Sequence, residues 1–131
     1  MTLADLGRMT QLWFTKAKDD LRVARALLDF ESEHNEATVF HCQQAAEKSI
    51  KGYLTHHKIR FNKTHDIEKL LEVVATIDKS LSAKFKKAGV LTKYAVAYRY
   101  PEEVELPEPL NKKISEEAFE LAKEIFEAFK N

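Results

Sequence analysis

The stretch TVFHCQQAAEKSIKGYLTHH, residues Thr38–His57, decides how the rest of the chain is arranged. One set of its residues recurs every three or four positions, which is the spacing of one helix face. This set is Val39, Cys42, Ala46, Ile50, Tyr53, Leu54 and His57. A polar line at the same spacing runs beside it and comprises Gln43, Gln44, Glu47 and Lys51. A surface helix normally has one apolar stripe and a solvated opposite face, so this pattern predicts a central, mostly buried helix.

The position of the polar line in the fold decides the argument about function. Buried amides and charges are costly when they have no hydrogen-bond partners. The line therefore either meets partners inside the fold or faces a cleft. The first alternative makes it a structural feature, whereas the second makes it a candidate binding surface.

The composition predicts a single all-α domain. The chain has 131 residues, of which 44% are hydrophobic and 32% charged, with only three glycines and three prolines. A chain of this length can bury a real core, and few helix breakers favour helices. We expect residues 1–9 to be a loose lead-in and residues 10–131 to form one helical domain.

Charge and cysteine content exclude several classes of protein. Lysine plus arginine and aspartate plus glutamate each number 21, so net charge is zero. This argues against binding duplex nucleic acid through bulk charge, although it allows a local basic patch. Cys42 is the only cysteine, which excludes an internal disulfide and suits a reducing cytosol. No apolar run has the length of a membrane span, and the N-terminus lacks a signal-peptide pattern. We expect a cytoplasmic protein without membrane association.

Helical periodicity extends through most of the remaining sequence. The expected helices span about residues 10–31, 36–57, 64–77, 81–98 and 115–129. Thr64 is expected to cap the third helix, Gly89 is a possible kink in the fourth, and the last begins at Ser115 or nearer Asn111. Gly52, inside the second helix, indicates either close approach of another backbone or simple tolerance. Residues 101–110 hold all three prolines and predict an extended loop.

The segment Tyr98-Arg99-Tyr100-Pro101 carries the sharpest chemical signal. Arginine offers a planar fork that suits phosphate or carboxylate, and tyrosines can stack on bases. The alternative is a helix end at which Arg99 pairs with Glu47 or Glu102. Residue chemistry alone leaves these two interpretations open.

Other candidate residues carry weaker signals. His65 precedes a helix start, where it either meets a phosphate or bonds locally. The five histidines lack metal-ligand spacing, and no glycine-rich phosphate loop or nucleophile motif is present, so we predict no metal and no cofactor. Phe119 and Phe126 lie seven residues apart, which fits either a dimer face or core packing. Cys42 is expected to be an inert apolar thiol.

Three segments in this order resemble the HEPN (higher eukaryotes and prokaryotes nucleotide-binding) domain family. They are FHCQQAAEKSIKGYL, THDIEKLL and LTKYAVAYRYP, and the resemblance covers about Trp13 to the C-terminus. It implies an up-and-down bundle of four long helices plus a short helix, normally a homodimer. It also implies nucleotide binding, partnership with a small nucleotidyltransferase, or RNA cleavage in toxin–antitoxin pairs.

The nuclease members of that family carry an arginine followed four to six residues later by a histidine. Here no histidine follows Arg99, because His65 is the last histidine in the chain. Metal-independent RNA cleavage needs a group that moves the 2′-hydroxyl proton, and histidine usually supplies it. We therefore predict no catalytic residue and lean away from an enzyme.

The resemblance implies a binding site made of central-helix residues and of the segment around Arg99. The expected site residues are Gln43, Gln44, Glu47, Lys48, Lys51, His65, Tyr98, Arg99 and Tyr100. Lys51 and Arg99 would hold phosphate, the glutamines would donate hydrogen bonds, and a tyrosine would stack. The leading hypothesis is a non-enzymatic module that binds a nucleotide, a small nucleotidyltransferase, or both, in a toxin–antitoxin-like system. The alternatives are a ribonuclease toxin with an altered site and a purely structural dimerisation module.

Overall fold

The computed structural model describes residues 1–30 and 33–130, and within them the fold is all-α, as the sequence predicts. Its helices are α1 (Leu3–Phe30), α2 (Asn35–His56), α3 (Ile67–Val74), α4 (Lys79–Lys84), the 3₁₀ helix η1 (Lys86–Ala88), α5 (Gly89–Arg99) and α6 (Lys112–Phe129). The first expected helix end and the following link fall partly on residues 31–32, which lie outside the described residues. None of the described helices has the length and apolar character needed to cross a membrane.

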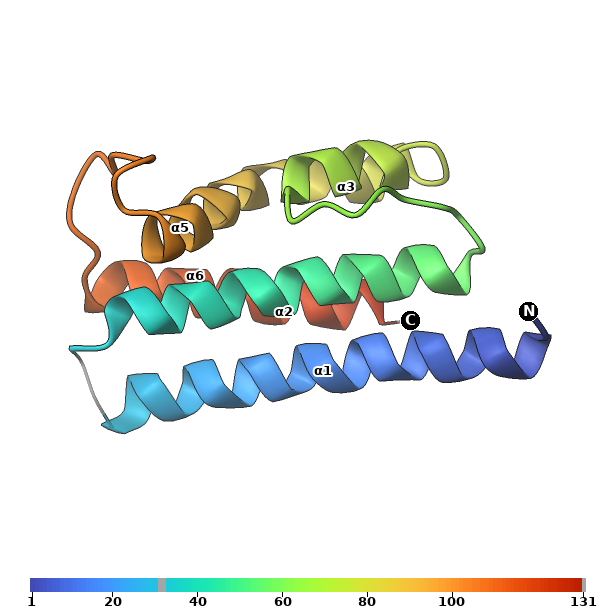
Figure 1. Cartoon of the computed structure of the whole chain (residues 1–131), viewed down its shortest axis with the longest axis horizontal. Coiled ribbons are helices and arrows are strands. Elements are labelled where there is room, and N and C mark those ends of the chain that lie inside the picture. Colours follow the sequence, from blue (N-terminus) through green and yellow to red (C-terminus); the bar gives the residue numbers. More distant parts are fainter. Residues whose placement is uncertain (31–32, 131) are drawn as a thin grey trace.

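The long helices run alternately up and down, with α2 at the centre (Figure 1). Helix α2 packs against α1, α3, α5 and α6, whereas α1 packs mainly against α2 and α6. Fourteen of the 18 residues of α2 between Thr38 and Thr55 are buried. The central, mostly buried helix predicted from the quoted stretch is therefore confirmed.

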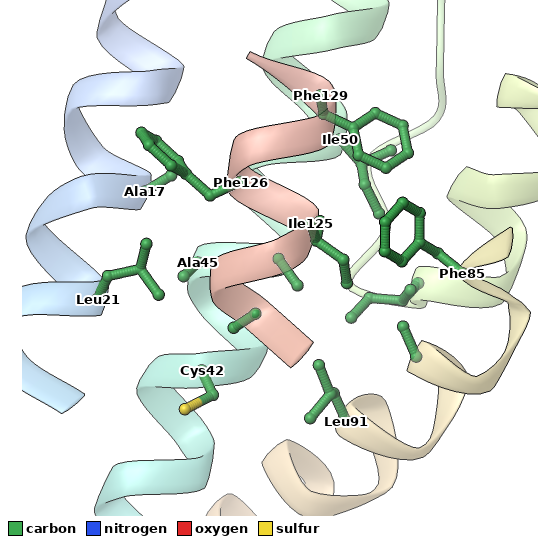
Figure 2. Packing of buried hydrophobic residues seen from close by; sticks show 14 of the residues in the cluster. Ala17, Leu21, Cys42, Ala45, Ile50, Phe85, Leu91, Ile125, Phe126 and Phe129 are labelled. Atoms are coloured by element: carbon green, nitrogen blue, oxygen red, sulfur yellow. The ribbon is translucent and has the colours of Figure 1, made fainter. Parts of the chain in front are cut away.

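The core lies between α2 and the surrounding helices (Figure 2). Phe85 and Phe129 are its largest fully buried side chains, and their ring centroids lie 5.7 Å apart. Phe119 and Phe126 are also buried, at 7% and 9% exposure. The core interpretation of these two phenylalanines therefore holds, and they do not form an exposed dimer face.

The first helix begins earlier than expected, because residues 3–9 continue α1 and are not a loose lead-in. The Thr2 hydroxyl accepts a hydrogen bond from the Asp5 backbone N–H at 3.0 Å. The Asp5 carboxylate in turn accepts one from the Thr2 backbone N–H at 3.1 Å. This reciprocal capping satisfies two backbone donors that would otherwise lack partners, and it starts the helix at Leu3.

The single helix expected over residues 81–98 is divided into α4, η1 and α5. The chain turns at Phe85, which is only 1% exposed and enters the core. Burial of this large ring outweighs the helical continuity suggested by local periodicity. Gly89 has helical dihedral angles, and a Cβ there would lie 2.5 Å from the Glu68 side chain, so its role is close packing of α5 against α3.

The residues that cap α3 and α6 can be compared with those expected from the sequence. Helix α3 is capped by Asp66 rather than Thr64, because the Asp66 side chain accepts from the backbone N–H groups of Glu68 and Lys69. Asn111 caps α6, which agrees with the earlier of the two expected starts. In both helices a side-chain oxygen satisfies backbone donors that have no partner within the helix.

Gly52 lies where the side chains of α1 pack tightly on α2. A Cβ at this position would lie 2.9 Å from the Phe14 ring and 3.0 Å from the Trp13 Cβ. The neighbour is thus a pair of α1 side chains rather than a second backbone. Absence of a side chain at Gly52 lets these aromatic residues cover α2 beside Lys51.

Candidate functional site

Two lines of side chains on α2 concern the site, one buried and polar, the other half-exposed and of mixed polarity. Gln43, Glu47 and Lys51 are buried, with 0%, 3% and 6% exposure. The half-exposed line comprises Ala37, Phe40, His41, Gln44 and Lys48, which are the residues of α2 between Ala37 and Thr55 that reach solvent. The sequence pattern placed Gln43 and Gln44 on one line, whereas the tertiary structure separates them.

The buried line is satisfied within the chain. The Gln43 side-chain amide donates to Glu47 Oε1 and to the backbone carbonyl of His65, both at 3.0 Å. Lys51 Nζ donates to Glu47 Oε2 at 3.1 Å, and the Gln44 amide donates to Gln43 Oε1 at 2.7 Å. No buried side-chain nitrogen or oxygen of the described residues lacks a hydrogen-bond partner.

Aromatic rings complete the surroundings of Lys51. Its ammonium lies 5.6 Å from the centroid of the Trp13 ring and 5.9 Å from that of Phe61. These rings exclude water, and their faces attract the cation. Burial of the charge is therefore compensated by Glu47 on one side and by two aromatic rings on the others. This arrangement fixes the loop 57–66 against α1 and α2.

His65 joins the buried network to solvent. Its Nδ1 lies 3.0 Å from Glu47 Oε1, while its side chain is 70% exposed. A carboxylate can only accept hydrogen bonds, so the Nδ1–H group of His65 donates to Glu47, and Nε2 is the ring nitrogen that Glu47 does not engage. The sequence proposed either a phosphate contact or a local hydrogen bond for His65, whereas the structure pairs it with Glu47 of α2, 18 residues away in the sequence.

A second charged cluster joins α1 to α2. The buried Asp20 carboxylate accepts from Lys48 Nζ at 2.6 Å and contacts His41 Nδ1 at 2.9 Å. Sequence reasoning missed both Asp20 and His41. The available signal was Asp20 itself, an acidic residue three positions after Ala17 and four before Ala24, both of which are fully buried. A carboxylate on a buried helix face needs a partner on the neighbouring helix.

Tyr98 and Arg99 reach the same side of α2 through Phe40. The Tyr98 and Phe40 rings are stacked, with centroids 4.9 Å apart and an interplanar angle of 30°. The Arg99 guanidinium lies 4.9 Å from the Phe40 centroid, and it pairs with neither Glu47 nor Glu102. Tyr100 is the C-cap of α5 and is 51% exposed, and its backbone N–H donates to the Val96 carbonyl at 2.7 Å.

These residues define a surface that we call the α2 strip: Phe40, His41, Gln44 and Lys48 on α2, with Tyr98, Arg99 and His65 beside it. Phe40 precedes Gln44 by one helical turn, and Gln44 precedes Lys48 by another, so they share one side of the helix. Arg99 lies at the Phe40 end and makes no direct hydrogen bond to either glutamine within the described residues. The strip thus combines two cations, of which Lys48 is paired with Asp20, with an amide, two imidazoles and two aromatic rings.

Other features of the chain fit binding chemistry less well. Burial raises the pKa of the Cys42 thiol to about 12, with a further contribution from Asp20, so this thiol stays protonated and unreactive.

A cavity of about 940 Å³ lies between the start of α2 and residues 101–110, but its lining includes Glu36, Glu102, Glu105 and Glu108. Such a lining repels phosphate. Among the described residues, no group of three or more His, Cys, Asp or Glu side chains is placed to hold a metal ion.

The fold and the strip define a class: an up-and-down helical bundle whose central helix has a polar, partly accessible side. The family model of the HEPN domain matches residues 10–131, and the chain belongs to this family. Two crystal structures are similar, one of ST0689, an archaeal HEPN homologue, and one of TT1696 from Thermus thermophilus. Their sequence identities are 26% and 27%; each alignment has a TM-score of 0.73 and covers 92% of this chain and 94% of the other. No curated protein matches.

Proposed function

We propose that this HEPN domain is a non-enzymatic module that binds a nucleotide on the α2 strip. The observation that carries the proposal is the alignment of Phe40, Gln44 and Lys48 along the accessible side of an otherwise buried helix, with the Arg99 guanidinium over the Phe40 ring. Lys48 and Arg99 would contact phosphate, Gln44 would bond a base or sugar edge, and Tyr98 would stack on a base.

The buried line supports this surface rather than contacting the ligand. Gln43, Glu47 and Lys51 are closed off from solvent by loop 57–66 and by Trp13. In the proposal Gln43 orients Gln44, and Glu47 orients His65, so that both present fixed polar groups to the strip. Rotamers fixed in this way lose less entropy when a ligand binds.

Replacing Arg99 with alanine is expected to weaken nucleotide binding by about tenfold to a hundredfold. A charge-assisted hydrogen bond contributes about 1.5–3 kcal/mol, which corresponds to this range. Isothermal titration calorimetry with ATP, GTP and a short RNA measures the effect. Arg8→Ala is the matched control, because Arg8 is an exposed arginine near the start of α1.

Both variants should unfold at the temperature of the wild-type protein. Binding that is equally weakened by Arg8→Ala, or unaffected by Arg99→Ala and Lys48→Ala, would contradict the location of the site. If none of the three ligands produces heat with the wild-type protein, nucleotide binding itself is excluded and the structural alternative gains support.

The proposal extends to a protein partner of the nucleotidyltransferase class, as the two-component system implied by the family resemblance requires. The test is co-expression of this chain with any small nucleotidyltransferase encoded in the adjacent reading frame. Co-elution of the two chains in size-exclusion chromatography supports the partnership, whereas separate elution or the absence of such a reading frame argues against it.

A second candidate function, ribonuclease activity with an altered site, is favoured by one specific observation. His41 and His65 are each held at Nδ1 by a buried carboxylate, which leaves Nε2 of each ring available. One imidazole could accept the proton of a ribose 2′-hydroxyl as its oxygen attacks phosphorus. The other could donate a proton to the departing 5′-oxygen, so that the proton balance is closed.

If this second function is correct, the purified protein degrades single-stranded RNA without added metal. His41→Ala and His65→Ala are each expected to reduce the rate by about a hundredfold or more, since general acid–base catalysis contributes about 10²–10⁴-fold. His34→Ala is the control, because His34 is exposed and precedes α2. RNA that stays intact with the wild-type protein leaves binding without cleavage as the function.

A further inference from the structure

A groove of about 450 Å³ runs between α1 and α6. The chain begins and ends at the same end of the bundle, so these two helices are antiparallel (Figure 1). Helix α1 packs more extensively against α2 than against α6, and the groove lies along the less extensive of the two junctions. We call it the α1–α6 groove, and it shares no residue with the α2 strip.

The floor of the α1–α6 groove is apolar. It is formed by Leu21, Ala26, Phe30, Phe119 and Phe126. Leu21 and Phe126 belong to the core and lie between the two helices (Figure 2). Phe30, by contrast, is 86% exposed at the end of α1. One exposed apolar residue is ordinary on a protein surface, but an exposed ring beside an apolar groove offers an anchor for a partner.

Cations line both walls of the groove. They are Lys18, Arg22 and Arg25 on α1 and Lys123 on α6. The two carboxylates of the lining already have partners: Asp29 pairs with Arg25 at 2.7 Å. Glu127 pairs with Lys130 at 3.0 Å. Arg22 has only an exposed contact with Asp19 at 3.9 Å. Lys18 and Lys123 make no ion pair within the described residues, so the groove presents positive charge from both helices.

We propose that the α1–α6 groove binds an acidic amphipathic helix of a partner protein. Such a helix has apolar side chains on one face and carboxylates along both borders of that face. The groove lining extends on α1 from Lys18 to Phe30, which is about 18 Å and equals about three turns of a helix. Apolar side chains spaced three and four residues apart enter the floor, while the carboxylates meet the cations of both walls.

A second groove shows why charge, and not apolar lining alone, selects this partner. A groove of about 620 Å³ lies between α5 and α6 and is also partly apolar. Its charged lining consists of Lys87, Lys113, Glu116, Glu117, Glu120 and Glu124. An acidic helix is repelled there, so charge assigns it to the α1–α6 groove. The inference holds whether or not a nucleotide or a nucleotidyltransferase binds, because it uses no residue of the α2 strip.

Two synthetic peptides test the charge of the partner. The acidic probe is an amphipathic peptide of about four helical turns, with leucine on one face and glutamate elsewhere. The basic probe has lysine in place of every glutamate. Fluorescence anisotropy with the full chain is expected to show about tenfold tighter binding of the acidic probe, and the difference should shrink as salt is added. No binding of the acidic probe, or equal binding of the two, would overturn the proposal.

Charge reversal tests the location. Lys18→Glu combined with Lys123→Glu reverses one cation on each wall. It should weaken binding of the acidic probe by about tenfold or more and strengthen binding of the basic probe. Lys16→Glu combined with Lys93→Glu is the matched control, because it changes net charge equally at exposed lysines outside the groove. Equal effects of the two double variants would mean that net charge attracts the probe and that the location is wrong.

Truncation of Phe30 tests the apolar anchor. Phe30→Ala is expected to weaken binding of the acidic probe by about fivefold or more. Val23→Ala removes another exposed apolar side chain of α1, outside the groove, and should leave binding unchanged. Sedimentation velocity of the same proteins without peptide identifies a different occupant. If Phe30→Ala or the reversal of Lys18 and Lys123 converts a wild-type dimer into a monomer, a second copy fills the groove and the proposal is wrong.

Discussion

Replacing Glu47 with alanine is expected to lower the free energy of unfolding by about 3–5 kcal/mol, because removal of one partner leaves a buried charge uncompensated. Glu47 accepts hydrogen bonds from Gln43 and Lys51 and contacts His65, and its side chain is only 4% exposed. Without it the ammonium of Lys51 has no counter-charge between Trp13 and Phe61. Urea denaturation followed by far-ultraviolet circular dichroism measures the loss.

Two further substitutions test whether the loss of stability comes from the buried charge of Glu47 and not simply from replacing a helical glutamate with alanine. Glu124→Ala makes the same chemical change on the exposed side of α6 and should alter the free energy of unfolding by less than about 0.5 kcal/mol. Glu47→Gln keeps the shape and part of the hydrogen bonding, and its effect should lie between the two. If Glu47→Ala is as stable as Glu124→Ala, the buried network does not hold loop 57–66 in place.

Replacing Phe129 with alanine should destabilise the fold by about 3–5 kcal/mol, the range for truncating a buried aromatic ring. Phe129 is 1% exposed although it is the last residue of α6. Its ring meets Tyr53 edge-on with a centroid distance of 5.1 Å, and it also contacts Phe85 (Figure 2). Loss of the ring would leave a cavity between α2, α6 and η1. Thermal unfolding and urea denaturation both measure this effect.

Phe30→Ala is the matched control, because the same ring is removed from the end of α1, where it is 86% exposed. Its free energy of unfolding should change by less than about 0.5 kcal/mol. Equal losses for the two phenylalanine variants would mean that the end of α6 is not docked on the core. This outcome would also weaken the description of α2 as a mostly buried helix covered in part by α6.

The stability prediction for Glu47 and the binding prediction for Arg99 test whether these two residues have different roles. Glu47 and Arg99 belonged to one expected site, but the structure assigns them different surroundings. Glu47 lies in a closed network, whereas Arg99 lies on the Phe40 ring at the surface. Loss of stability at Glu47 and loss of binding at Arg99, each without the other, would demonstrate this division.

The periodicity of the sequence was enough to predict the all-α class, the central helix and the order of helices. These properties depend on which residues are apolar and how they are spaced, and both are local. The segments around Gln43, Asp66 and Arg99 also carried the family resemblance, which the HEPN domain match confirms. The capping pair Thr2–Asp5 was present in the sequence as well, and its recognition would have placed the start of α1 correctly.

Only the tertiary structure decided which polar residues reach solvent. Gln43 and Gln44 are adjacent in sequence, but loop 57–66 covers the first and leaves the second at the surface. The contacts between Asp20 and His41, and between Arg99 and Phe40, join residues on different helices, which local spacing does not pair. The burial of Phe85 likewise interrupts a helix whose local pattern was continuous. Local spacing fixes the face of a helix on which a side chain lies, whereas the packing of other helices fixes what that face meets.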